Sequence, residues 1–139
     1  MKILMLSWEY PPRIVGGLAR HVYWLSKYLT MKGIKVYVVT LSEGDKEYVE
    51  LKEGIHIYRV NPYRIPLPDF TSWVHQFNYT MLKKCIEIIR DIGIDLIHAH
   101  DWLVAHAAIA LKHIFRIPLV TTIHSTEHGR RGGIHNEFE

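Results

Sequence analysis

The sequence has 139 residues, of which 48% are hydrophobic and 22% are charged, and its formal net charge is +3 at pH 7. This length suits one domain with its own core, and the composition is typical of a globular protein. Scattered basic residues argue against a nucleic-acid partner, and no apolar run approaches the roughly 20 residues that span a bilayer.

The cysteine and histidine content narrows the chemistry further. The single cysteine, Cys85, excludes an internal disulfide and indicates a reducing, cytoplasmic location. The amino terminus is predicted to be a strand and not a signal peptide. Ten histidines are present, but none shows H-E-x-x-H or another recognised metal-ligand spacing, so no metal site is predicted.

The chain begins with a predicted strand, a glycine turn and a helix. Residues 2–7 are a short apolar run that suits a buried strand, and the prolines of the following segment WEYPPR forbid regular structure. Gly16 and Gly17 then open a helix. Its apolar residues have the spacing of one helix face and are Leu18, Val22, Leu25 and Leu29.

Such a glycine turn lies at the carboxyl end of its strand, where doubly wound folds bind ligands. Gly16 and Gly17 would let a phosphate approach, and the free N–H groups of the helix start attract anions. However, neither G-x-G-x-x-G nor G-K-[ST] is present. A tight turn between strand and helix is therefore the alternative explanation of these glycines.

The next segments predict two further strands. Gly33 follows the helix at a position that favours a left-handed cap. Residues 34–41 are β-branched and almost continuously apolar, which predicts a central parallel strand. Residues 42–53 are polar and are predicted to form a surface loop, and residues 54–60 a third, more peripheral strand.

A long helix is predicted after the proline-rich segment 61–69, with Asp69, Thr71 or Ser72 as its cap. Its apolar residues repeat at steps of three and four and are Trp73, Phe77, Met81, Cys85, Ile88 and Ile92. Cys85 is therefore expected to be an inert, buried thiol and not a nucleophile.

The remaining segments predict a helix between two strands. Gly93 ends the long helix, residues 94–99 form a fourth strand, and residues 118–123 form a fifth strand that is apolar enough to be central. The helix between them, residues 103–115, is expected to bury Leu103, Ala107, Leu111 and Ile114. The order β-α-β-β-α-β-α-β predicts an α/β domain with three layers and a mostly parallel sheet.

Polar residues follow three of these strands, and the carboxyl ends of parallel strands meet at one edge. The candidates are Glu9, Tyr10, Arg13, Gly16 and Gly17 after the first strand, His100, Asp101 and Trp102 after the fourth, and His124, Glu127 and Arg130 after the fifth. Hydrogen-bonding groups beside aromatic faces suit a sugar or a phosphorylated ligand better than an apolar one.

Structural explanations compete for several of these residues. His98 is expected to be a hydrogen-bonded core histidine. His100 and Asp101 could cap the adjacent helix, and Arg130 could be a solvated surface residue or could clamp an anion. His124 is the hardest to explain structurally and is the preferred functional residue.

The sequence resembles the amino-terminal domain of retaining GT-B glycosyltransferases in three motifs: SWEYPPRIVGGLARHV, DLIHAHDWLVAHAA and PLVTTIHSTEHGRRGG. They occur in the order typical of the family 4/5 group, which includes glycogen and starch synthases. The resemblance implies two Rossmann-like domains across a cleft. The amino-terminal domain would hold a glycan or another hydroxyl acceptor, and the carboxyl-terminal domain the nucleotide sugar.

The resemblance also implies hexosyl transfer from an ADP-, UDP- or GDP-sugar with retention, and no cofactor or required metal. In this family the glycine loop approaches the donor diphosphate, which implicates Gly16 and Gly17. The histidine of T-x-H lies beside the transferred sugar, which implicates His124.

Two departures favour a family 4 sugar transferase over a strict glycogen synthase: Ile14 replaces a lysine of that motif, and Leu103 replaces the last histidine of H-D-W-H. The E-x7-E carboxylates of the donor domain are absent. Residues 1–139 are thus expected to form one acceptor-side domain that lacks its carboxyl-terminal partner, self-associates and is inactive alone. The rival interpretation is a non-catalytic module that binds a sugar phosphate or a partner protein.

Overall fold

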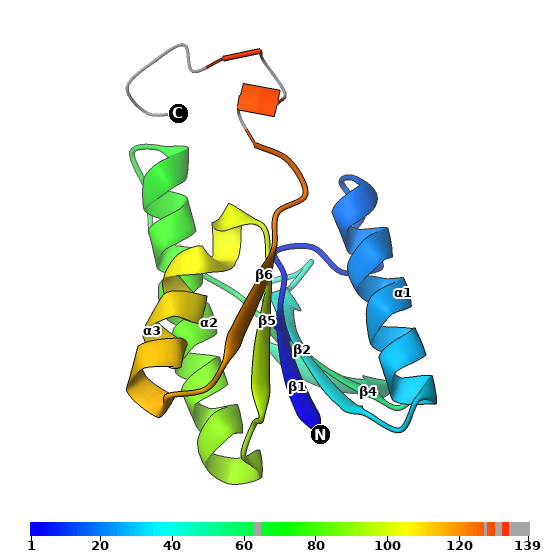
Figure 1. The fold of residues 1–139 in the computed structure, drawn as a ribbon. Helices are drawn as coiled ribbons and strands as arrows, with labels where there is room; N and C mark the ends of the chain where they lie inside the picture. The colour runs from blue at the N-terminus through cyan, green and yellow to red at the C-terminus, as the bar shows by residue number, and fades with distance from the viewer. Residues whose placement is uncertain (63–64, 127, 130–131, 134–139) are drawn as a thin grey trace.

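The computed structural model describes residues 1–62, 65–126, 128–129 and 132–133, and its centre is a six-stranded sheet (Figure 1). The strands are β1 (Lys2–Leu6), β2 (Lys35–Leu41), β3 (Tyr48–Lys52), β4 (Ile55–Val60), β5 (Leu96–His100) and β6 (Leu119–Thr122). Their order across the sheet is β3-β4-β2-β1-β5-β6, with β3 antiparallel to β4 and the other neighbours parallel. The predicted mostly parallel α/β fold is confirmed.

Helices cover both faces of the sheet and complete the three layers. Helix α1 (Gly17–Met31) packs on one face against β2 and β4. On the other face lie α2 (Phe70–Ile92) and α3 (Ala105–Phe115), which pack against each other (Figure 1). A short 3-10 helix, η1 (Trp102–Val104), joins β5 to α3. Among the described residues, none of these helices is both long enough and apolar enough to cross a membrane.

Strand β2 shows why the sequence folds into layers. Val36 and Val38 belong to the buried cluster under α1, whereas Tyr37 and Val39 belong to the cluster under α2 and α3. Side chains of a strand alternate between its two faces, so a strand that is apolar at every position is buried on both. The prediction that residues 34–41 form a central parallel strand is confirmed.

Helix α2 begins and ends where its sequence predicts. The carboxylate of Asp69 accepts a hydrogen bond from the backbone N–H of Ser72 at 2.7 Å, and Gly93 ends the helix with a φ of 71°. Cys85 lies on the packed face and is fully buried. Burial raises the pKa of its thiol, which agrees with an inert core residue.

The prediction of a surface loop over residues 42–53 is wrong, because β3 lies within it. Tyr48, Val49 and Leu51 are exposed, so β3 carries no burial pattern that the sequence could reveal. Backbone pairing with β4 holds this strand at the edge of the sheet. Glu53 and Gly54 form its turn, with φ values of 52° and 79°, so Gly54 precedes β4 and is not part of it.

Strand β6 is also placed differently from the prediction, since it is an edge strand in the described part of the chain. Val120 and Ile123 are 47% and 55% exposed. The predicted burial of Ile114 is wrong as well, because that side chain at the end of α3 is 58% exposed. Together these residues leave apolar surface at this end of the sheet.

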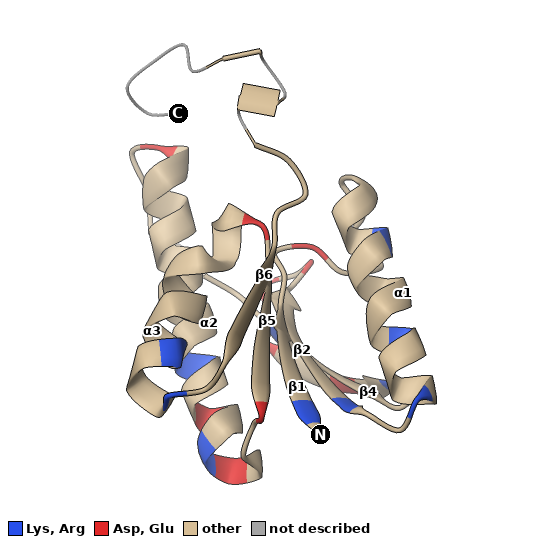
Figure 2. Ribbon diagram, in the orientation of Figure 1, with Lys and Arg blue, Asp and Glu red and all other residues tan. Residues whose placement is uncertain are grey.

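Charged residues of both signs are interspersed over the helices and the strand ends (Figure 2). Two ion pairs illustrate this mixture: Lys27 with Glu53 at 2.7 Å and Lys84 with Glu87 at 2.6 Å. Exposed pairs of this kind contribute little to stability. The surface that the structure describes therefore shows no single-sign patch of the kind that binds nucleic acid.

Candidate functional site

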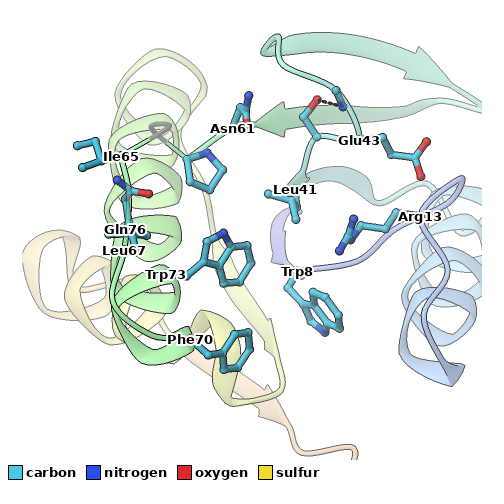
Figure 3. A pocket seen from close by; sticks show the side chains of 13 residues that line it. Trp8, Arg13, Leu41, Glu43, Asn61, Ile65, Leu67, Phe70, Trp73 and Gln76 are labelled. Carbon is cyan, nitrogen blue, oxygen red and sulfur yellow. Dashed lines mark hydrogen bonds between the residues drawn. The ribbon is translucent and has the colours of Figure 1, made fainter.

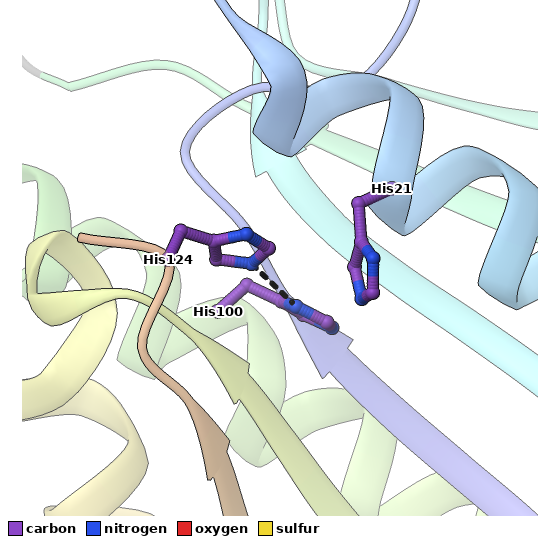
Figure 4. Close-up of side chains that lie close together, drawn as sticks. All are labelled: His21, His100 and His124. Carbon is purple, nitrogen blue, oxygen red and sulfur yellow. Dashed lines mark hydrogen bonds between the residues drawn. The ribbon is translucent and has the colours of Figure 1, made fainter.

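Four histidines from three parts of the chain meet at the carboxyl ends of β5 and β6. His98 and His100 lie on the same face of β5, with ring centroids 4.1 Å apart. The ring of His124, which follows β6, lies 5.6 Å from that of His100. His21 of α1 completes the group, with its ring 5.0 Å from His124 and 5.7 Å from His100 (Figure 4).

Hydrogen bonds fix most of this histidine cluster (His21, His98, His100 and His124). The Nδ1 of His100 and the Nε2 of His124 are 3.4 Å apart, and the Nε2 of His98 pairs with the Thr122 hydroxyl at 2.8 Å. The prediction that His98 is hydrogen-bonded is confirmed. The Nε2 of His100 is buried and has no hydrogen-bond partner among the described residues.

The surroundings of His98, His100 and His124 lower the pKa of each ring and favour its neutral form. Burial, followed by the neighbouring His98 and His124, lowers the pKa of His100 to about 3. Burial and His21 also lower the pKa of His124, although Asp101 and Glu9 act in the opposite direction. A neutral imidazole has one N–H donor and one lone pair. At neutral pH these three rings can therefore donate and accept hydrogen bonds without carrying charge.

Asp101 acts as a cap, as the structural alternative proposed. Its carboxylate accepts from the backbone N–H of Trp102 at 3.0 Å, and its own N–H donates to the carbonyl of Thr122 at 2.9 Å. Its φ of 67° is unusual for a residue other than glycine and costs about 1–3 kcal/mol. Trp102 is 43% exposed and lies edge-on to Phe70, so its ring contacts the start of α2.

Glu9 organises the glycine turn from inside the protein. Its carboxylate accepts hydrogen bonds from the backbone N–H groups of Val15 at 2.5 Å and Gly16 at 3.1 Å, and the residue is only 2% exposed. The N–H of Gly16 is therefore already used. At Gly17 no atom of the described residues lies within 4 Å of the position that a Cβ would take. Of the two glycines, Gly17 has the open approach that a phosphate needs.

The prediction that Tyr10 lines the ligand edge is wrong. Its ring is 2% exposed, and its hydroxyl pairs with that of Ser26 on α1 at 3.1 Å. The guanidinium of Arg59 lies 5.9 Å from the ring centroid on the side of the sheet. Tyr10 is a core residue that fastens α1, because its hydroxyl finds a buried partner there.

A cleft of about 640 Å³ lies beyond the ends of β1, β2 and β4, beside the start of α2 (Figure 3). Trp8, Phe70 and Trp73 supply aromatic faces, and the guanidinium of Arg13 lies 5.4 Å from the Trp8 ring. Gln76 also lines the cleft. Among the described residues, the Nε of Arg13 and the Oε1 of Gln76 are buried without hydrogen-bond partners. Both atoms are covered by neighbouring side chains, so a small side-chain rotation would bring them to a ligand in the cleft.

The predicted site residues thus separate into distinct groups. The structure brings His100 and His124 together and places Arg13 in the cleft, whereas Glu9 and Tyr10 are internal. Glu127 and Arg130 lie outside the described residues.

Two parts of the site were not predicted from the sequence. His21 lies one helical turn after Gly17, and the spacing of four residues was the signal that could have linked them. Gln76 and Trp73 belong to α2, which sequence alone does not place beside the end of β1.

The sequence is similar to known glycosyltransferases. The sequence matches Glycosyltransferase Family 4 over residues 15–139. It is 43% identical to an uncharacterized glycosyltransferase of Methanocaldococcus jannaschii over 99% of this chain and 34% of the relative. It is 36% identical to the glycogen synthase of Mycobacterium tuberculosis, over 96% of this chain and 36% of the relative.

A solved structure has the same fold. Sucrose-phosphate synthase from Thermosynechococcus elongatus superimposes with a TM-score of 0.73 at 18% identity, over 94% of this chain and 37% of that chain. The chain therefore spans roughly a third of the length of these proteins. The predicted resemblance to glycosyltransferases is confirmed.

Proposed function

Because the chain belongs to glycosyltransferase family 4, we propose that it forms the acceptor-side domain of a retaining hexosyltransferase. The donor is a nucleotide sugar, and the acceptor is a glycan or a smaller hydroxyl compound. The observation that carries this proposal is the meeting of His100 and His124, as neutral rings, at the sheet edge beside α1. One helical turn before His21, the same helix starts at the open position of Gly17.

The donor end of the site combines the start of α1 with His124. The first turn of α1 has no side-chain cap at Gly16 and contains no acidic residue, so its N–H groups and dipole favour the diphosphate. His124 donates one hydrogen bond and accepts another near the transferred sugar. Burial lowers the pKa of His124 and favours the neutral ring. His124 acts as a hydrogen-bonding group, since the leaving phosphate takes the hydroxyl proton.

The chemistry proposed is a front-side displacement at the anomeric carbon. The acceptor hydroxyl attacks the face from which the nucleotide diphosphate leaves, and a phosphate oxygen of the leaving group takes the hydroxyl proton. No covalent bond to the protein forms. The protein contributes position and charge stabilisation. The reaction needs no cofactor or metal.

The acceptor is proposed to bind in the cleft beside α2. A volume of about 640 Å³ suits a small-molecule ligand. Trp8 and Trp73 offer faces for stacking against a sugar ring, and hydroxyl groups would satisfy Arg13 Nε and Gln76 Oε1. A second, carboxyl-terminal domain of the same protein would hold the nucleotide.

A donor screen on the full-length protein tests this function. Release of nucleotide diphosphate is measured for ADP-, UDP- and GDP-hexoses, with and without oligosaccharide acceptors, and the anomeric configuration of the product is determined by NMR. We expect one donor class to support acceptor-dependent release with retention. Binding of a sugar phosphate without release from any donor would instead support the non-catalytic module.

A further inference from the structure

Three histidines of the cluster are arranged like the ligands of a metal ion. One ring nitrogen from each of His21, His100 and His124 lies within 4.8 Å of the other two. Nitrogen ligands of tetrahedral zinc, bound at about 2.0–2.1 Å, lie roughly 3.4 Å from one another. The pair formed by His100 Nδ1 and His124 Nε2 already has a separation of 3.4 Å.

His21, the third ligand, can reach this geometry by a small rotation of its side chain. His21 is exposed on α1, so its side chain can rotate by the small amount that the remaining separation requires. His100 is fixed, because it is fully buried at the end of β5. The site is therefore partly preorganised. His100 has a fixed position, whereas His21 on α1 can adjust to the ion.

The tautomer that this site needs at His100 is compatible with the surroundings of the ring. The Nε2 of His100 is fully buried and has no hydrogen-bond partner within the described part of the chain, so no acceptor or donor there fixes its protonation. The ion would bind Nδ1, and the single proton of the neutral ring would stay on Nε2. His98 supports the ring from behind, since it is itself anchored to Thr122.

We propose that His21, His100 and His124 bind one divalent transition-metal ion of the zinc class, with a fourth position open for water. Imidazole nitrogens select Zn²⁺, Co²⁺, Ni²⁺ or Cu²⁺ over Mg²⁺ and Ca²⁺, which prefer oxygen. Three protein ligands leave one coordination position free. The site does not depend on the proposed transferase function. If both hold, the ion and the donor sugar compete for His124.

Metal binding is tested on purified, tag-free protein that has been freed of metal with a chelator. Titration with Co²⁺ should give the visible absorption of a four-coordinate ion, saturating at one ion per chain. Zn²⁺ should displace Co²⁺ and abolish that absorption. Mg²⁺ should do neither.

Two exposed helix histidines provide a matched pair of variants. His21→Ala removes a ligand and should weaken Co²⁺ binding by more than about tenfold, the least that loss of even an outer-shell partner costs. His75→Ala removes a histidine of α2 that faces His106, with ring centroids 4.8 Å apart, and should bind as tightly as the wild type. Circular dichroism checks that both variants fold.

Three outcomes would overturn the proposal. These are binding of no Co²⁺ by the wild type, unchanged binding by His21→Ala, and equal weakening by His75→Ala. If His21→Ala does not fold, His124→Ala takes its place with the same expected loss. Neither readout requires sugar transfer, so failure of the metal site and failure of the proposed function are distinguishable.

Discussion

The Nδ1 of His100 and the Nε2 of His124 lie 3.4 Å apart, although 24 positions separate the two residues in sequence. The parallel pairing of β5 with β6 produces this contact, because it aligns His100 with Thr122, two residues before His124. His124 is therefore held by a neighbouring ring and not by burial within a central strand.

His124→Ala is expected to lower kcat by roughly 10²-fold or more in the full-length enzyme, the effect of losing one group that stabilises a transition state. Stability should change little, because His124 lies beyond the end of β6. Steady-state kinetics and thermal unfolding measure the two effects. His113→Ala, at the exposed end of α3, serves as the control. Turnover of His124→Ala within a few-fold of wild type would transfer the role to His100 and Asp101.

Gly17→Val is expected to raise the KM for the donor and leave the fold intact. Added side-chain volume would occupy the space where phosphate oxygens approach, and no described atom lies within 4 Å of the new Cβ. Gly17→Ala should have a smaller effect in the same direction. Donor KM and Tm are compared for both variants. Normal donor affinity in Gly17→Val would mean that the glycine only forms a turn.

The sequence predicts the central part of the fold well because parallel strands are buried on both faces. Residues 2–7 and 34–41 are apolar at nearly every position, and they form β1 and β2. Strand β3 escaped prediction for the opposite reason. Val49 and Leu51 are exposed, and the strand is held by backbone pairing with β4 and by the ion pair of Glu50 with Arg59 at 2.7 Å. Edge strands depend on hydrogen bonds that leave no pattern in side-chain hydrophobicity.

Only the part of the site that lies at strand ends could be predicted from the sequence. His100 and His124 follow directly from the rule that parallel strands end at one edge. Sequence position does not show which way a side chain points, so Glu9 and Tyr10 were placed on the ligand side although both are buried. His21 was missed because its contribution depends on how α1 is seated on the sheet.

Glu9→Ala is expected to lower the free energy of unfolding by about 1.5–3 kcal/mol, the range for hydrogen bonds to a charged group. Both of its bonds, from Val15 and Gly16, end on the same carboxylate oxygen. Glu9→Gln can keep an oxygen at that position and should therefore be much less destabilising. Urea unfolding of the two variants distinguishes these effects. Equal stability of Glu9→Ala and wild type would show that the turn forms without this contact.

Gln76→Ala is expected to raise the KM for the acceptor by about tenfold, which corresponds to about 1.4 kcal/mol for one lost hydrogen bond, without changing the KM for the donor. The side chain lines the cleft, and its Oε1 is buried without a partner in the described structure. His75→Ala, the exposed neighbour on α2, is the control. If Gln76→Ala raised the KM for the donor as much as the KM for the acceptor, Gln76 would not be a specific acceptor contact.

The exposed edge of β6 is expected to make the isolated 139-residue chain self-associate. Val120 and Ile123 are 47% and 55% exposed, and among the described residues no strand pairs with the outer side of β6. An apolar strand edge is a template for pairing with another chain. Val120→Lys places a charge on this edge and should shift the chain toward monomer. Val49→Lys makes the same change on β3, at the opposite edge, and serves as the matched control. Light scattering over a concentration series measures both. A wild-type chain that stays monomeric at high concentration would contradict this prediction. If only Val49→Lys made the chain monomeric, the contact between chains would lie at β3 and not at β6.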